Sequence, residues 1–230
     1  RGDPEQTTSG TTVCQLGTTV SGTNDLVTAR LAGGSAGVND IDGGAGNDTA
    51  SYADTFGVTA DLAVSGPQST AGTLVGVENL IGSSLYADVL KGDGGANRLI
   101  AGGGHDTLMG RGGNDILDGG DGFDTVSYAD ASAGVTVDLA TAGPQNTGEG
   151  TDTLISIENV TGSAFADTLR GTSGDNILIG GAGDDTLFGL GGSSDRLDGG
   201  DGIDTASYAG VTAGVRIDLN VTGSQYTGIG

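Results

Sequence analysis

The sequence has 230 residues, of which 48 are glycine, and its 30 acidic residues outnumber eight basic ones to give a net charge of −22. This acidic excess argues against nucleic acid and against anionic membrane surfaces as partners, because no basic stripe could neutralise phosphates. Aromatic residues make up only 4% of the chain, and no apolar run approaches the roughly 18 residues of a membrane span. We therefore expect neither a large apolar core nor membrane insertion.

The N-terminal part of the chain leads into a first, partial repeat. Residues 1–33 are predicted to form an N-terminal segment or cap. Residues 34–51 form a partial array that ends in Gly43-Gly-Ala-Gly-Asn-Asp-Thr-Ala-Ser51. Residues 52–82 are predicted to be a β connector, because Val58, Ala60 and Leu62 alternate as in half-buried strands.

A strict nine-residue period fills the first full array, residues 83–127. A position-six residue recurs every nine residues in a background of glycine, and an apolar residue follows each one by two positions. The position-six residues are Asp88, Asn97, Asp106, Asp115 and Asp124, and the apolar residues are Leu90, Leu99, Leu108, Leu117 and Val126. Such a period is typical of calcium-binding parallel β-helix repeats.

The pattern then recurs at larger scale. Residues 128–162 form a second connector, residues 163–207 a second array, and residues 208–230 a third connector that stops mid-unit, which predicts a piece of a longer repetitive protein. In the second array the position-six residues are Asp167, Asn176, Asp185, Asp195 and Asp204, and one extra residue precedes Asp195. The pairs Glu78-Asn79 and Glu158-Asn159 recur in the connectors. We expect them to form side-chain stacks, with calcium ligation as the alternative.

Each nonapeptide reads as a short strand followed by a glycine turn. Glycine permits positive φ and close backbone approach, so two strand–turn units make one coil of 18 residues. Leu90, Leu108 and Val126 should then stack on one wall of the coil, and Leu99 and Leu117 on the other. The sequence therefore predicts an all-β parallel β-roll, or β-helix solenoid, of tandem nonapeptide repeats with short β connectors.

Calcium is the cation that fits these turns. It takes six to eight oxygen ligands in flexible geometry, and each turn offers a position-six side chain and exposed carbonyls. Zinc is disfavoured, because one His and one Cys cannot build its usual site. Since ligands on one edge lie 18 residues apart, we predict sites at six pairs, or about six or more ions. The pairs are Asp88–Asp106, Asp106–Asp124, Asn97–Asp115, Asp167–Asp185, Asp185–Asp204 and Asn176–Asp195.

Catalysis has little support in the sequence, and we predict no enzymatic activity. No H-E-x-x-H motif, nucleophile elbow or matched pair of catalytic carboxylates is present. The single histidine, His105, stands at the variable fifth position of a unit, where we expect it to face solvent.

The nonapeptides resemble those of the RTX (repeats-in-toxin) family of secreted proteins, whose arrays form a calcium-folded parallel β-roll. The resemblance implies ligation by the position-six side chain and by the carbonyls of positions two and four. Carried onto this sequence, it adds a set of glycines and Asp48 to the position-six residues already named: Gly44, Gly46, Asp48, Gly102, Gly104, Gly113, Gly120, Gly122, Gly181, Gly183, Gly200 and Gly202. Elsewhere the fit is partial: Arg111 stands at position two before Asp115, and Ser84 and Tyr86 replace both glycines before Asp88.

The resemblance also implies a function and a location. We expect a calcium-binding structural segment of a secreted or cell-surface bacterial protein, exported from a Gram-negative cell by type I secretion. It would act as a scaffold, surface-layer, filament or adhesin spacer, with self-association or other surface proteins as partners. The alternative is a non-catalytic module of a secreted protease, lipase or polysaccharide epimerase.

Overall fold

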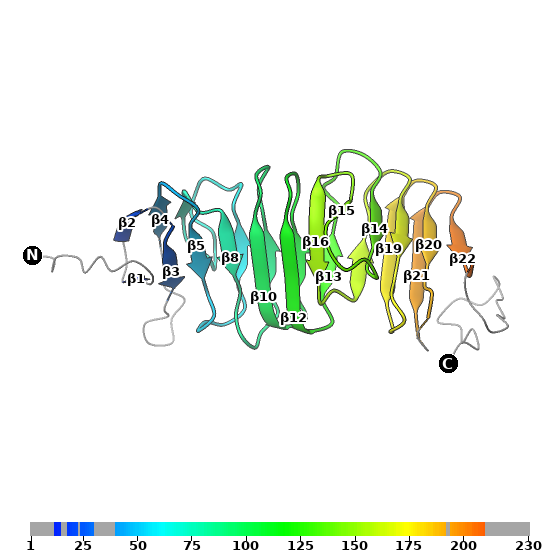
Figure 1. Cartoon of the computed structure of the whole chain (residues 1–230), viewed down its shortest axis with the longest axis horizontal. Coiled ribbons are helices and arrows are strands. Elements are labelled where there is room, and N and C mark those ends of the chain that lie inside the picture. Colours follow the sequence, from blue (N-terminus) through cyan, green and yellow to red (C-terminus); the bar gives the residue numbers. More distant parts are fainter. Residues whose placement is uncertain (1–11, 15–17, 23, 30–39, 192–193, 210–230) are drawn as a thin grey trace, which may run out of the picture.

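The computed structural model describes residues 12–14, 18–22, 24–29, 40–191 and 194–209, and in them the chain winds as one elongated roll of stacked coils (Figure 1). Strands run in chain order along the roll, and nearly all pairs are parallel. In this part of the chain no helix has the length and hydropathy that a membrane span requires. Residues 210–230 of the third connector and residues 34–39 of the partial array lie outside the described residues.

Four sheets make up the walls of the roll. The first follows the order β1-β3-β5-β8-β10-β12-β16-β15. Its strands are Thr12–Cys14 (β1), Leu26–Ala29 (β3), Thr49–Ser51 (β5), Asn79–Ile81 (β8), Arg98–Gly104 (β10), Ile116–Gly122 (β12), Thr151–Ile155 (β16) and Gln145–Asn146 (β15). Only the β15–β16 pair of this sheet is antiparallel.

The second sheet follows the order β21-β19-β17-β13-β11-β9-β6 and faces the first across the core. Its strands are Arg196–Asp201 (β21), Ile177–Ala182 (β19), Asn159–Thr161 (β17), Thr125–Ser127 (β13), Thr107–Met109 (β11), Val89–Lys91 (β9) and Thr59–Asp61 (β6). The two smaller sheets lie toward the ends of the roll. They contain Thr136–Asp138 (β14), Thr168–Arg170 (β18), Thr186–Phe188 (β20) and Thr205–Ser207 (β22), and Thr18–Gly22 (β2), Ile41–Gly44 (β4) and Leu74–Val75 (β7).

The core is a narrow stack of single apolar residues, one from each strand. Leu108 pairs with Leu90 and with Val126 in neighbouring strands, and Leu99 pairs with Leu117 on the opposite wall. All five are fully buried. The predicted all-β parallel roll and the predicted stacking of its two walls are therefore confirmed.

The connectors are additional coils of the same roll. Strand β8 pairs with β5 of the partial array and with β10 of the first array, and β17 joins β13 to β19 in the same way. Tyr52 and Tyr128 are buried in these coils, where the Tyr52 hydroxyl donates to the Ala71 carbonyl at 2.8 Å. These two tyrosines thus have a structural role.

Candidate metal centres

Position-six side chains form continuous ladders along the edges of the roll, where strands meet turns. We call each such residue a rung. In most coils a side-chain oxygen of one rung accepts a hydrogen bond from the backbone N–H of the rung one coil earlier. Asn97 and Asn176 instead donate through Nδ2 to the backbone carbonyl of the earlier rung. The first ladder contains Asp25, Asp48, Glu78, Asn97, Asp115 and Asp152; the second contains Asp88, Asp106, Asp124, Glu158, Asn176 and Asp195; the third contains Asp167, Asp185 and Asp204.

The structure brings together all six residue pairs that the 18-residue spacing predicts. The N–H to Oδ1 distances are 2.7 Å for Asp88–Asp106, 2.8 Å for Asp106–Asp124, 2.9 Å for Asn97–Asp115, 2.8 Å for Asp167–Asp185, 3.0 Å for Asp185–Asp204 and 2.9 Å for Asn176–Asp195. The extra residue before Asp195 therefore does not interrupt its ladder.

The second carboxylate oxygen of several rungs is buried and has no hydrogen-bond partner among the described residues. This holds for the Oδ2 atoms of Asp25, Asp48, Asp106, Asp115, Asp124 and Asp185. A buried carboxylate without donors is costly unless a cation or a proton compensates its charge. Each of these oxygens therefore marks a place where a cation would stabilise the fold.

Four of these carboxyl groups have raised pKa values. Burial, reinforced by the charges of Asp124 and Asp88, raises the pKa of Asp106 to about 6. Burial and the charge of Asp152 raise the pKa of Asp115 to about 7. Burial also raises the pKa of Asp124 and of Asp185. Without a cation, the roll thus disfavours the ionised state of these carboxyl groups.

Stacked glycine turns supply the remaining oxygens beside the ladders. The pairing of β10 with β12 continues through their turns, with Gly102 opposite Gly120 and Gly104 opposite Gly122. A Cβ at Gly120 would collide with the Gly102 carbonyl oxygen, and one at Gly122 with that of Gly104. The carbonyls of positions two and four therefore point at the next coil, close to the carboxylates.

The glycine at position one of the turn has a steric role that the sequence did not reveal. A Cβ added at Gly119 would lie 2.6 Å from Asp124 Oδ2, and one at Gly110 would collide with Asp115 Oδ2. Glycine at position one leaves room for the carboxylate of its own turn. The family pattern does contain this glycine, but its carbonyl is not among the expected ligands.

The donor set consists of oxygen alone. Among the described residues no group of three or more His, Cys, Asp and Glu side chains converges on one point, so a cation bound here would need backbone carbonyls beside one or two carboxylates. His105 is exposed, as expected, and its Nδ1 accepts a hydrogen bond from the Phe123 N–H at 2.9 Å. Calcium, a hard ion that takes carboxylate and carbonyl oxygens in flexible geometry, fits such a set.

Four predicted ligands differ from the other rungs. The side-chain oxygens of Asp88, Asn97, Asp167 and Asn176 accept hydrogen bonds from the backbone of their own turns at 2.6–2.8 Å. They belong to the ladders, but none has an unpaired buried oxygen.

The sequence analysis missed two rungs, Asp25 and Asp152, and did not place Glu78 and Glu158 in the ladders. Asp25 and Asp152 precede Val27 and Leu154 by two residues, which is the spacing of the repeat. Glu78 and Glu158 have the same spacing from Leu80 and Val160 and accept from the Asp48 and Asp124 amides at 2.7 and 2.9 Å. The two glutamates thus replace aspartate where an array passes into a connector. Both glutamates hold rung positions, and calcium ligation by them stays a prediction.

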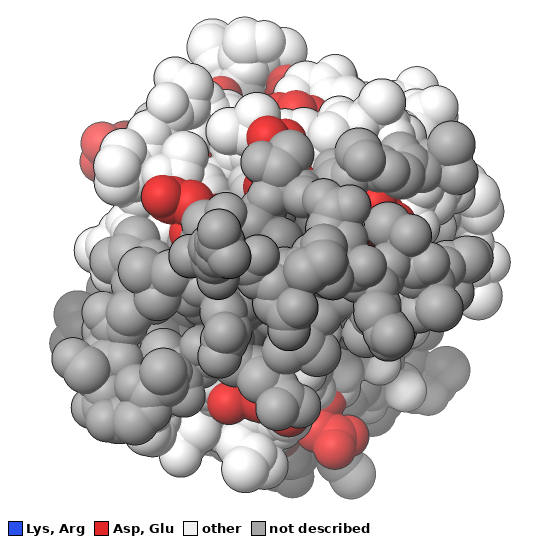
Figure 2. Space-filling view, turned by 90° about the vertical axis from the view of Figure 1, so that its left-hand side faces the viewer, with Lys and Arg blue, Asp and Glu red and all other residues white. Residues whose placement is uncertain are grey.

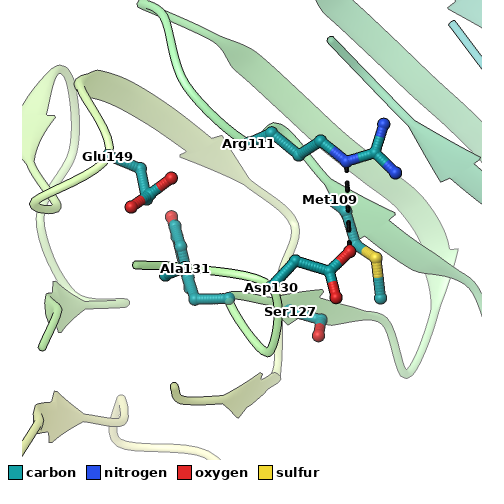
Figure 3. A pocket seen from close by; sticks show the side chains of 7 residues that line it. Met109, Arg111, Ser127, Asp130, Ala131 and Glu149 are labelled. Atoms are coloured by element: carbon teal, nitrogen blue, oxygen red, sulfur yellow. Dashed lines mark ion pairs between the residues drawn. The ribbon is translucent and has the colours of Figure 1, made fainter. Parts of the chain in front are cut away.

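Arg111 joins the first array to two connectors. Its guanidinium forms a bidentate pair with Asp61 at 2.7 and 2.8 Å, and its Nε lies 4.0 Å from Asp130. Figure 3 shows Arg111 and Asp130 facing each other at a hollow of about 170 Å³, with Glu149 on its far side. The departure from glycine at this position therefore has a structural explanation.

Acidic side chains also lie on the outside of the roll. Figure 2, viewed from the N-terminal end, shows Asp and Glu at several places around the described surface. Repulsion among them adds to the cost of folding without a counterion.

The fold and the ladders together define a class: parallel β-rolls whose stacked turns present oxygen-lined cation sites. The family model of the RTX calcium-binding nonapeptide repeat matches the chain in four copies, over residues 34–50, 86–126 and 161–194. No curated protein matches the chain. Over these segments the chain thus carries RTX calcium-binding nonapeptide repeats.

Proposed function

We propose that this chain is a calcium-folded structural segment of a secreted or cell-surface protein, where it serves as a scaffold or spacer. The observation that carries the proposal is the recurrence of buried, unpaired Asp oxygens along the ladders. Each requires a positive charge, and repeats of this family bind calcium.

We assign the side-chain ligands to the position-six aspartates of the later rungs and the carbonyl ligands to the glycines of positions two and four. The aspartates are Asp48, Asp106, Asp115, Asp124, Asp185, Asp195 and Asp204, and the glycines are Gly44, Gly46, Gly102, Gly104, Gly113, Gly120, Gly122, Gly181, Gly183, Gly200 and Gly202. About six or more ions would then bind, each with an affinity on the order of 10⁻⁴–10⁻³ M, the range of extracellular modules.

Such affinities support an extracellular location. Millimolar calcium outside a cell would fill these sites, whereas the far lower cytosolic level would leave the net charge of −22 uncompensated. The chain would then stay unfolded before export and fold afterwards, as its resemblance to the family implies.

The scaffold role rests on the shape and repetition of the roll. Each long unit adds coils to both main sheets without starting a separate core. Solenoids of this kind extend by addition of units, since each repeat contacts only its neighbours. We infer no catalytic activity for the segment.

A calcium titration followed by far-UV circular dichroism tests the proposal, with magnesium as the control. We expect a cooperative gain of β signal with calcium alone, together with a fall in the radius of gyration measured by small-angle scattering. A spectrum that is already β-rich in chelator and does not respond to calcium would contradict it.

A further inference from the structure

The turns of the two arrays have two backbone conformations at position two. At seven turns the φ angle there is positive: 86° at Gly44, 108° at Gly102, 63° at Arg111, 90° at Gly120, 117° at Gly181, 71° at Leu190 and 95° at Gly200. At four other turns, position two is Ser83, Asp93, Ser163 or Thr172, and φ is negative. Ser83 takes this place because its turn is one residue longer, so that Ser83 stacks on Gly102.

The sign of φ decides where the N–H of position two points. In the four turns with negative φ, this N–H donates to the position-six side chain of the same turn. The distances are 2.6 Å for Ser83–Asp88, 2.8 Å for Asp93–Asn97, 2.6 Å for Ser163–Asp167 and 2.7 Å for Thr172–Asn176. The Ser163 hydroxyl adds a second donor to Asp167 at 2.8 Å.

In five of the seven turns with positive φ, the position-six carboxylate is buried and keeps an unpaired oxygen, whereas Asp195 and Asp204 in the other two turns are not buried. Asp48, Asp106, Asp115, Asp124 and Asp185 are each at most 1% exposed, and each has an Oδ2 without a partner among the described residues. Arg111 is the informative case, because it is not glycine and yet keeps φ positive, and its turn leaves Asp115 unpaired. Backbone conformation, and not the residue type alone, therefore separates the two groups.

We propose that the sign of φ at position two divides each array into closed rungs, which need no metal, and open rungs, which hold calcium. The proposal rests on the calcium-binding function above and specifies which rungs carry it. The first two rungs of each array are closed: Asp88 and Asn97, then Asp167 and Asn176. The next three are open, since Leu190 and Gly200 also have positive φ before Asp195 and Asp204.

The closed state explains why both arrays place asparagine at the second rung. The Oδ1 atoms of Asn97 and Asn176 accept from their own turns, while their Nδ2 groups donate to the Glu78 and Glu158 carbonyls at 2.8 and 2.7 Å. A neutral amide thus links the connector coil to the array, at a point where an open rung would require an ion.

Two matched substitutions test the division by the number of calcium ions bound, measured by equilibrium dialysis and by calorimetry. Asp167→Asn alters a closed rung and Asp185→Asn an open one in the next coil. We expect Asp167→Asn to bind as many ions as the parent chain, and Asp185→Asn to lose at least one. Equal losses in both variants would overturn the division, whereas a parent chain that binds no calcium would instead refute the proposed function.

A second pair of variants tests the backbone cause. Ser163→Gly with Phe165→Gly rebuilds a complete glycine turn before Asp167, and Ser163→Ala with Phe165→Gly removes the hydroxyl but keeps the preference for negative φ. We expect one additional ion in the first variant and none in the second. A gain in both, or in neither, would show that φ at position two does not control the site.

Discussion

The arrays and the connectors build coils of one roll, but they compensate their buried polar groups in different ways. In the first array, Asp106 and Asp124 each leave one oxygen unpaired. In the connector that follows, the buried Asp152 accepts from the Thr147 hydroxyl at 2.7 Å and from the Tyr128 hydroxyl at 3.4 Å. In the connector, hydroxyl groups of the protein itself thus compensate the buried carboxylate of Asp152. In the array, the unpaired oxygens of Asp106 and Asp124 have no such donors, and we propose that a cation compensates them.

The glutamines of the connectors likewise form hydrogen bonds with residues of their own connector. The Asp138 N–H donates to the Gln145 side chain at 2.8 Å, and Gln145 returns a bond to the Asp138 carbonyl at 2.9 Å. Gln68 and Asp61 form the equivalent pair at 2.7 and 2.8 Å. The comparison predicts that calcium dependence is local: it should reside in the turns of the arrays and not in the roll as a whole.

Removal of calcium should have the largest effect and should separate the two regions. A site filled at about 100 times its dissociation constant contributes about 2.7 kcal/mol, so turns 101–106 and 119–124 should exchange amide hydrogens about 100-fold faster after chelation. Exchange within residues 128–152 should change much less. Hydrogen-exchange mass spectrometry measures both at once, and an equal increase throughout would refute local dependence.

Gly120→Ala should damage the array even at saturating calcium. Its φ of 90° strains any residue with a Cβ, and the added atom would collide with the Gly102 carbonyl. The strain alone costs about 1–3 kcal/mol in the free energy of unfolding. Gly66→Ala in the connector is the matched control, because nothing lies within 4 Å of its added Cβ. Denaturant titration of both variants should show a lowered midpoint only for Gly120→Ala.

Gln145→Ala should destabilise the connector by about 1–3 kcal/mol, since it removes two hydrogen bonds. Neither bond involves a ladder residue, so the number of calcium ions bound should stay the same. Urea unfolding and equilibrium dialysis on the same sample check the two halves of this prediction. A loss of bound calcium would show that connector and array are coupled.

Acidification should give the smallest effect, and its sign should differ from ordinary acid denaturation. In calcium-depleted buffer the folded-state pKa values of Asp106 and Asp115, about 6 and about 7, exceed their unfolded values. The folded state therefore binds protons more tightly, and its stability should fall as pH rises through that range. Circular dichroism between about pH 5 and about pH 8 should show more β signal at the acid end. The opposite trend would mean that the array carboxylates are not buried without calcium.

Much of the site was predictable because residues two nonapeptides apart in the sequence lie next to each other in the roll. A spacing of 18 residues placed Asp106 next to Asp88 and Asp124, and the structure brings these residues together. The role of position two was not predictable. Arg111 is not glycine, and yet its backbone keeps the positive φ that the glycines have at this position. Ser83 and Ser163 looked like gaps in the motif, although their N–H groups are the donors that close the first rungs.

The sequence by itself determined the coil, its apolar pairs and the chemistry of its turns, since all three follow from a local period of nine residues. Only the tertiary structure decided how the ladders continue from one array to the next. Through Glu158 the Asp124 ladder passes to Asn176 and Asp195, while Asp167 begins a new ladder beside it. The physical reason is that the path of each connector's strands decides which ladder the position-six residues of the next array join. That path depends on long-range backbone pairing, which a local repeat does not encode.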